Sequence, residues 1–244
     1  MATFTDFSNI LPNPSNSIAY DGSSNSNNAG YAAGPGYASV KVSSNFRTSK
    51  DQTNTGRHIA RAKAFQNYDI DIRYNNLTEE EFNVVYGFLL EKQGMLKTFF
   101  VPLPQYDNPQ DGTLVSSSPS FTTNGSTSAG ATTITIQDGS YDSANDGTLR
   151  PGDMITFTDS SDSNHLKAYK VTRVETAANY TGSQPLATQL RLHVSPSLQK
   201  TVSGGSTVNY TNPKVKVIMK SDTVNYELKT NNLYSLALSV EEVQ

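Results

Sequence analysis

The sequence predicts a mostly β protein, with a β-sandwich domain that carries one packed α-helix and an inserted small β-barrel or β-sandwich domain. Of the 244 residues, 35% are hydrophobic and only 17% are charged, and Ser, Thr, Asn and Gly fill much of the remainder. These polar residues favour turns over helix interiors. Apolar residues alternate with polar ones in many short segments, whereas helical spacing of apolar residues is clear in one segment.

Residues 12–36 are crowded with Asn, Ser, Gly and Ala and predict a flexible surface arm. Their apolar content is too low to offset the entropy of ordering such a segment alone. Tyr20, Tyr31 and Tyr37 interrupt the segment. Two interpretations stay open, because amphipathic aromatic side chains can anchor an arm on a neighbouring subunit or can be solvated in a loop.

The first strands are expected shortly after this arm. Val40 and Val42 alternate with polar residues, and residues 58–64 form a weaker extended segment. Between them, residues 43–56 are predicted to be a polar connection. The clearest strand is 68–74, where Tyr and Ile alternate with charged residues, so that one face is buried and the other is solvated.

The strongest local pattern predicts a helix over residues 78–93. Thr78 and Glu81 have the spacing of a capping box, and the three acids Glu79 to Glu81 lie at the positive end of the helix dipole. Leu77 and Phe82 are placed as a hydrophobic staple. The apolar stripe at positions i, i+3, i+4 and i+7 consists of Phe82, Val85, Tyr86 and Leu89. Gly94 is expected to supply the left-handed stop, and residues 97–101 start the next strand.

The Ser-, Thr- and Gly-rich segment 112–131 predicts a boundary to a second domain. We expect that domain to cover residues 125–211 and the first domain to be discontinuous, over residues 1–111 and 212–244. Insertions of this kind are tolerated at exposed loops. Strands are expected at 132–137, 153–158, 167–174, 189–194 and 207–210 in the insertion, and at 215–219, 224–228 and 234–240 after it.

Charge and composition disfavour several classes of protein. A net charge of −3 gives no broad attraction for nucleic acid or for anionic membranes. With no Cys, there are no disulfides and no thiolate metal sites. The first residues lack the basic start and apolar run of a signal peptide, and no stretch is long and apolar enough to span a bilayer, so synthesis in the cytoplasm and no membrane insertion are expected.

No residue is predicted to be catalytic, to bind a cofactor or to ligate a metal, and we expect the protein not to be an enzyme. His58, His165 and His193 lie far apart in sequence without a paired ligand spacing, so we interpret each as a surface or structural residue. No G-x-S-x-G elbow is present for a serine nucleophile.

Acidic residues and glycines offer weaker candidates. Residues 138–146 and 159–162 carry oxygen ligands that Ca²⁺ would accept, but neither matches the EF-hand register, and Asp and Asn are ordinary turn residues. The acids at 79–81 are explained by helix capping. The glycines at 34–36 and 204–205 lack the context of a phosphate-binding loop and predict turns.

Two stretches together resemble bacteriophage minor tail proteins of the distal tail or tail-hub kind. The first runs through Leu77-Thr-Glu-Glu-Glu-Phe82, Phe88-Leu-Leu-Glu-Lys-Gln-Gly94 and Lys97-Thr-Phe-Phe-Val-Pro102. The second combines residues 130–136, 147–153 and 190–198 and is similar to a β module of the same proteins. The two cover roughly half of the chain, and it is the order of these individually weak motifs that carries the resemblance.

The resemblance implies a structural virion protein of a phage tail tip, made in the host cytoplasm. Its expected partners are further copies of itself in a homo-oligomeric ring, the tail tube protein and other tail-tip or baseplate proteins, with no nucleic acid and no cofactor. The alternative is a carbohydrate- or receptor-binding β module that stacks a host surface glycan on Tyr141, Tyr169 or Tyr180. Trp, the richest stacking side chain, is absent.

Overall fold

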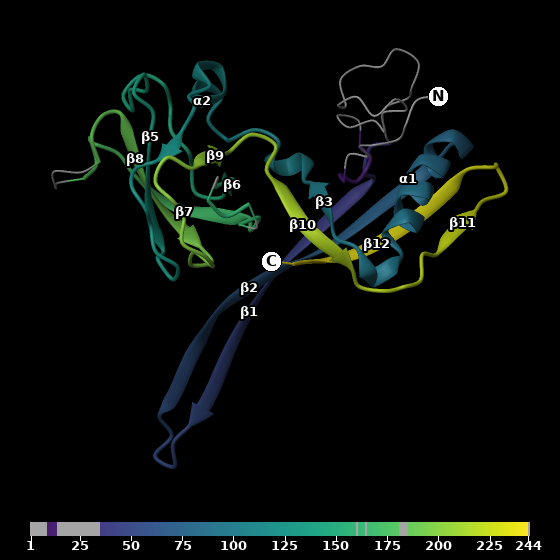
Figure 1. The fold of residues 1–244 in the computed structure, drawn as a ribbon. Coiled ribbons are helices and arrows are strands. Elements are labelled where there is room, and N and C mark those ends of the chain that lie inside the picture. Colours follow the sequence, from purple (N-terminus) through teal and green to yellow (C-terminus); the bar gives the residue numbers. More distant parts are fainter. Residues whose placement is uncertain (1–8, 14–34, 160, 164, 181–184, 244) are drawn as a thin grey trace. The chain divides into compact units, whose positions relative to one another are not determined.

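The computed structural model describes residues 9–13, 35–159, 161–163, 165–180 and 185–243 (Figure 1). It confirms the mostly β fold class. The chain divides into two compact units, which we describe separately. Unit 1 consists of the described parts of Met1–Asn45, Asn67–Pro102 and Lys216–Val243, and unit 2 consists of those of Phe46–Gln66 and Leu103–Val215.

The core of unit 1 is one sheet with the strand order β1-β2-β12-β10-β3, in which β11 also pairs with β12. The strands are β1 (Ser39–Gln52), β2 (His58–Leu77), β3 (Phe99–Pro102), β10 (Lys214–Met219), β11 (Tyr226–Leu228) and β12 (Tyr234–Glu242). The outer parts of β1 and β2, within Phe46–Gln66, fall in unit 2. Strand β12 pairs antiparallel with β2, with Leu238 opposite Ile72 and Val240 opposite Ile70. These four side chains are buried, so the predicted alternation of 68–74 is confirmed.

Strands β1 and β2 form a long hairpin, which corrects the expected polar connection over residues 43–56. Strand β1 continues to Gln52, and β2 runs from His58 to Leu77 without a break. The turn is closed by hydrogen bonds from Thr53 N to Arg57 O (3.0 Å) and from Gly56 N to Thr53 O (2.8 Å). A strand with polar residues on both faces has the composition of a loop, so the sequence does not reveal it. Its backbone N–H and C=O groups are nevertheless satisfied by the hydrogen bonds of the strand ladder.

Helix α1 (Glu79–Lys92) begins as predicted. The Glu81 backbone N–H donates to Thr78 Oγ1 (3.4 Å), and the Thr78 backbone N–H donates to Glu81 Oε2 (2.9 Å). The helix buries Phe82, Val85, Phe88 and Leu89, and the ring of Phe82 stacks on Tyr234 at 4.3 Å. The buried face differs from the predicted stripe, because Phe88 is buried and Tyr86 is only half-buried. The end of the helix also differs from the prediction.

The left-handed residue that ends α1 is Gln93 (φ 54°), one position earlier than expected. Gly94 (φ 65°) follows and opens the short 3₁₀ helix η1 (Gly94–Leu96). A Cβ on Gly94 would lie 2.8 Å from Asp222 Cα, and the Asp222 carboxylate accepts a hydrogen bond from Met95 N at 2.9 Å. Glycine is therefore needed there for close packing as well as for its positive φ.

The predicted N-terminal arm lies mostly outside the described residues, and Tyr20 and Tyr31 are among those not described. Residues 9–13, which include the first two of the predicted arm, belong to unit 1. Ile10 forms a parallel bridge with Phe100 of β3, and Leu11 N donates to Phe100 O at 2.8 Å. Tyr37 packs edge-on against Tyr74 at 5.4 Å, so this tyrosine is anchored on its own chain.

Unit 2 contains a closed six-stranded barrel with the order β4-β5-β8-β7-β6-β9 (Figure 1). Its strands are β4 (Thr122–Thr123), β5 (Thr133–Gln137), β6 (Met154–Thr158), β7 (Tyr169–Glu175), β8 (Gln189–Ser195) and β9 (Thr207–Asn209). The interior is filled by buried aliphatic and aromatic side chains that include Ile134, Ile136, Phe157, Val171, Leu190 and Leu192. Of the two expected architectures, the insertion adopts the barrel.

This unit begins before the expected residue 125. Strand β4 closes the barrel by pairing with both β5 and β9. Before it come η2 (Pro104–Tyr106) and helix α2 (Gly112–Ser117), and the side chains of Leu114 and Phe121 are buried in the barrel core. The Ser-, Thr- and Gly-rich segment 112–131 therefore contains a helix and a strand. Both are too short to give a periodic pattern in the sequence.

Candidate functional site

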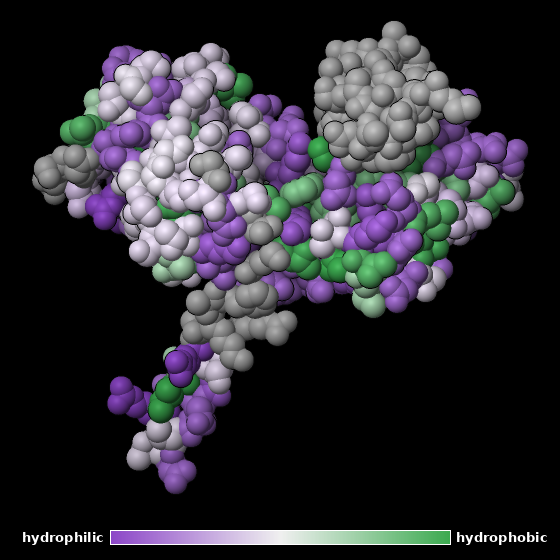
Figure 2. Space-filling view, in the orientation of Figure 1, coloured by the Kyte–Doolittle hydropathy of each residue, from purple (hydrophilic) through white to green (hydrophobic). Residues whose placement is uncertain are grey.

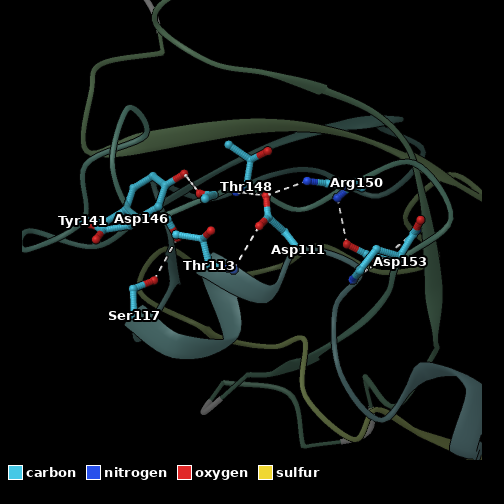
Figure 3. A network of polar contacts seen from close by, with 10 residues as sticks. Asp111, Thr113, Ser117, Tyr141, Asp146, Thr148, Arg150 and Asp153 are labelled. Carbon is cyan, nitrogen blue, oxygen red and sulfur yellow. Dashed lines mark hydrogen bonds and ion pairs between the residues drawn. The ribbon is translucent and has the colours of Figure 1, made fainter.

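A polar network in unit 2 surrounds Asp111, at the start of α2 (Figure 3). Its carboxylate accepts hydrogen bonds from Thr113 N (3.0 Å), Thr148 N (3.2 Å) and the Arg150 guanidinium (3.2 Å). The backbone hydrogen bond from Thr148 is the main reason why the pKa of Asp111 is lowered. Because its acceptor positions are used within the fold, this carboxylate caps a helix rather than holding a ligand.

The same network holds the loop before β6 in place by hydrogen bonds. The Tyr141 hydroxyl donates to Gly147 O (2.8 Å), and the Ser117 hydroxyl donates to Asp146 O (2.8 Å). Arg150 N donates to Asp153 Oδ2 at 2.7 Å. These contacts join the chain around α2 to the β5–β6 connection, so the network is structural.

The two stretches considered for calcium use their carboxylates in turns. Asp138 accepts from Ser120 N (2.7 Å) and Ser140 N (3.0 Å), and the Ser140 backbone bond is the largest cause of its lowered pKa. Asp159 accepts from Ser203 N and Ser161 N, both at 2.8 Å, and the Ser203 bond chiefly lowers its pKa. Within the described ranges, no three acidic or histidine side chains are grouped to hold a metal ion.

The three histidines have separate surroundings. His58 is exposed on β2. His165 is buried, its Nε2 lies 2.8 Å from the Tyr169 hydroxyl, and burial lowers its pKa. His193 Nε2 lies 2.9 Å from Glu175 Oε1.

A buried charge cluster on β7 and β8 was not predicted from the sequence. The side chain of Glu175 is 6% exposed, and its carboxylate lies 2.9 Å from His193, 3.1 Å from Arg173 and 3.8 Å from Arg191. The hydrogen bond with His193 is the first cause of its lowered pKa. The sequence shows only that charged residues alternate along the two strands. Which of them contact one another depends on the register between β7 and β8. The cluster joins two barrel strands.

Two of the three tyrosines predicted to stack a sugar, Tyr141 and Tyr169, are buried, which corrects their assignment as stacking residues. Tyr141 and Tyr169 are 2% and 0% exposed, because their rings fill the barrel core while their hydroxyls find hydrogen-bond partners. Tyr180 is half-buried, and the Arg191 guanidinium lies 5.4 Å from its ring centroid. Sequence alone shows that a tyrosine is amphipathic but not which end faces solvent.

Unit 1 carries two open surface hollows. One, of about 320 Å³, lies between the ends of β2, β11 and β12 and is lined by Arg73, Asn75, Glu227 and Ser235, among others. The other, of about 480 Å³, is lined by Asn9, Glu91, Leu96 and Lys97, among others. Neither is an enclosed cavity of the kind that surrounds most of a small ligand.

The most exposed structured feature is the β1–β2 hairpin. From residue 44 to residue 61, every described side chain is exposed except Thr53, which is half-buried. Phe46 and Ile59 are 67% and 52% exposed. The described end of the hairpin is mainly hydrophilic in Figure 2, with a small hydrophobic patch. Among the described strands, β1 pairs with β2 at one end of the sheet order.

A second exposed surface lies on unit 1, where α1 meets β11. Tyr226 and Leu228 are 51% and 53% exposed, and the Tyr226 ring contacts that of half-buried Tyr86 at 5.4 Å. Glu79 and Glu80, in the first turn of α1, are exposed and lie on the same helix about two turns before Tyr86. We call these five residues the acidic aromatic patch.

A scan against protein-family models finds no match, and a search of curated proteins finds no matching sequence. No helix in the described part of the chain combines the length and the apolar character needed to cross a membrane.

Proposed function

We propose that this protein is a structural subunit of a bacteriophage tail tip, of the distal tail or tail-hub kind, that forms a homo-oligomeric ring in the virion. In that position it joins the tail tube to the proteins that recognise the host. The work of such a subunit is done by its surfaces, so it requires no active site.

The observation that carries this proposal is the β1–β2 hairpin. A two-stranded ribbon is marginally stable in water unless it packs on something else. Over residues 44–61 every described side chain except half-buried Thr53 is exposed, and two large apolar side chains, Phe46 and Ile59, are more than half exposed. Such a ribbon is stabilised when a neighbouring chain packs against it, as happens in an assembly.

The resemblance of the sequence to minor tail proteins supports the same proposal. The motifs that carry it fall on the end of β2, on the capped helix α1 and on β3, which belong to one sheet-and-helix unit. The second set of motifs falls on β5, on the loop before β6 and on β8. Each set thus belongs to one structural unit.

The proposal is tested by mass photometry and negative-stain microscopy of the purified full chain, alone and with tail-tube subunits. We expect ring-shaped oligomers that attach to the end of a tube. A glycan array on the same sample covers the alternative function. Persistent monomers that ignore the tube and bind glycans would overturn the structural role.

A further inference from the structure

The charge of the chain is unevenly distributed between the hairpin and the rest. Residues 46–66 contain five Lys or Arg and a single Asp, whereas the remaining residues contain 14 Lys or Arg and 21 Asp or Glu. With neutral histidine, the hairpin segment has a net charge of +4 and the rest of the chain −7. A strongly basic ribbon is therefore attached to an acidic protein, and the overall charge of −3 conceals this.

The described basic side chains of this ribbon are available to a partner. Lys50, Arg57 and Arg61 are exposed and make no ion pair within the described residues. Phe46 and Ile59 on the same ribbon are also exposed. The surface that fits it must combine negative charge with an apolar area of similar size.

The acidic aromatic patch has these two properties. Glu79 and Glu80 supply negative charge without an ion-pair partner among the described residues. Further along the same helix, half-buried Tyr86 contacts exposed Tyr226 of β11, and exposed Leu228 lies two residues after Tyr226 on that strand. The rings of Tyr86 and Tyr226 are packed in place, because both contact the buried Phe82, at 5.1 and 4.8 Å.

We propose that the β1–β2 hairpin of one copy docks on the acidic aromatic patch of a second copy. Two different surfaces meet in this contact, so it is heterologous, and repeating it generates a ring when the rotation between copies closes. The inference rests on the proposed ring-forming function and names the surfaces that build the ring.

The test is a charge swap in the full chain, followed by mass photometry over a concentration series. Arg57→Glu with Arg61→Glu reverses the hairpin, and Glu79→Lys with Glu80→Lys reverses the patch. Each double variant is expected to raise the concentration at which oligomers form by about tenfold or more, because two attractive pairs become repulsive. Combining all four changes in one chain restores assembly. Mixing the two double variants also restores it, with the two chains alternating.

The matched control is Lys97→Glu with Lys216→Glu. It changes the net charge as much as the hairpin reversal does, at one exposed and one half-buried residue of unit 1 outside the patch. It is expected to assemble like the wild type. Circular dichroism checks that every variant is folded. A second variant, Phe46→Ser with Ile59→Ser, keeps all charges and is expected to weaken assembly, since both side chains are already exposed and their loss costs the monomer little.

The outcomes separate this inference from the function on which it rests. A wild-type chain that stays monomeric, with or without tail tube, overturns both. Wild-type rings that are unaffected by the hairpin and patch reversals overturn only the docking contact. Rings that persist while the hairpin reversal abolishes retention of a double-stranded DNA oligonucleotide also overturn it, because the basic ribbon then binds nucleic acid.

Discussion

At the scale of single residues, Gly147 shows how tightly the loop around α2 is packed. Its φ is 75°, and a Cβ at this position would lie 2.7 Å from the backbone nitrogen of Leu114. We expect Gly147→Ala to lower the free energy of unfolding by about 2 kcal/mol or more, from the left-handed backbone and the clash together. Urea denaturation followed by circular dichroism measures this.

Gly139→Ala is the matched control. A Cβ there meets no atom within 4 Å, and the backbone is not left-handed. Its unfolding midpoint is expected to stay within the error of the wild-type value. Equal losses for the two variants would contradict the packing account of Gly147.

Asp111 gives a prediction about pH. Because the folded protein lowers its pKa, chiefly through the Thr148 backbone bond, its contribution to stability is fully present above the unfolded pKa of about 3.9. The contribution is lost as the pH falls through the lower, folded value. Asp111→Asn keeps a good helix cap but removes the charge. We expect the gap between the urea midpoints of wild type and variant to narrow between pH 6 and pH 2, and a constant gap would refute this.

Single residues differ in how far their roles could be predicted from the sequence. The capping role of Thr78 and Glu81 was predictable, because both partners lie within one helical turn. The partners of Glu175 were not, because His193 and Arg191 are joined to it by the pairing of β7 with β8. The burial of Tyr141 and Tyr169 was also missed, since it depends on the closure of the barrel.

At the scale of elements, the contribution of the N-terminal cap of α1 to stability can be tested directly. Thr78→Ala removes the side chain that accepts the Glu81 N–H. We expect a loss of about 1 kcal/mol in the free energy of unfolding, the usual cost of losing such a cap. Urea denaturation measures it, with Thr132→Ala, at an exposed position of unit 2, as the control. No difference between the two variants would mean that the cap contributes nothing measurable.

The elements also show where periodicity fails as a predictor. Strands with one buried face, such as β5, β8, β10 and β12, alternate clearly and were predicted within one or two residues. The outer part of the β1–β2 hairpin has no buried face, so its sequence carries no alternation to detect. Strand β4 has two residues and cannot show a period at all.

At the scale of the whole molecule, the boundaries of the longer segment of unit 2, Leu103–Val215, predict which piece folds alone. A polypeptide of residues 103–215 contains all six barrel strands, whereas one of residues 125–211 lacks β4. We expect the longer piece to give a dispersed amide NMR spectrum and cooperative thermal unfolding. The shorter piece is expected to be much less stable, because β5 and β9 lose the strand between them. Equal stability would show that β4 is dispensable.

The route of the chain through unit 1 has a consequence for engineering and for evolution. Strands β3 and β10 are neighbours in the sheet, yet they stand on either side of the whole barrel sequence in the chain. Another domain whose N- and C-termini lie close together can thus replace the barrel without altering β3 and β10. This position in the chain is therefore a domain-insertion site. Recombination can exchange one inserted domain for another there, and a fluorescent or affinity domain can be inserted by design.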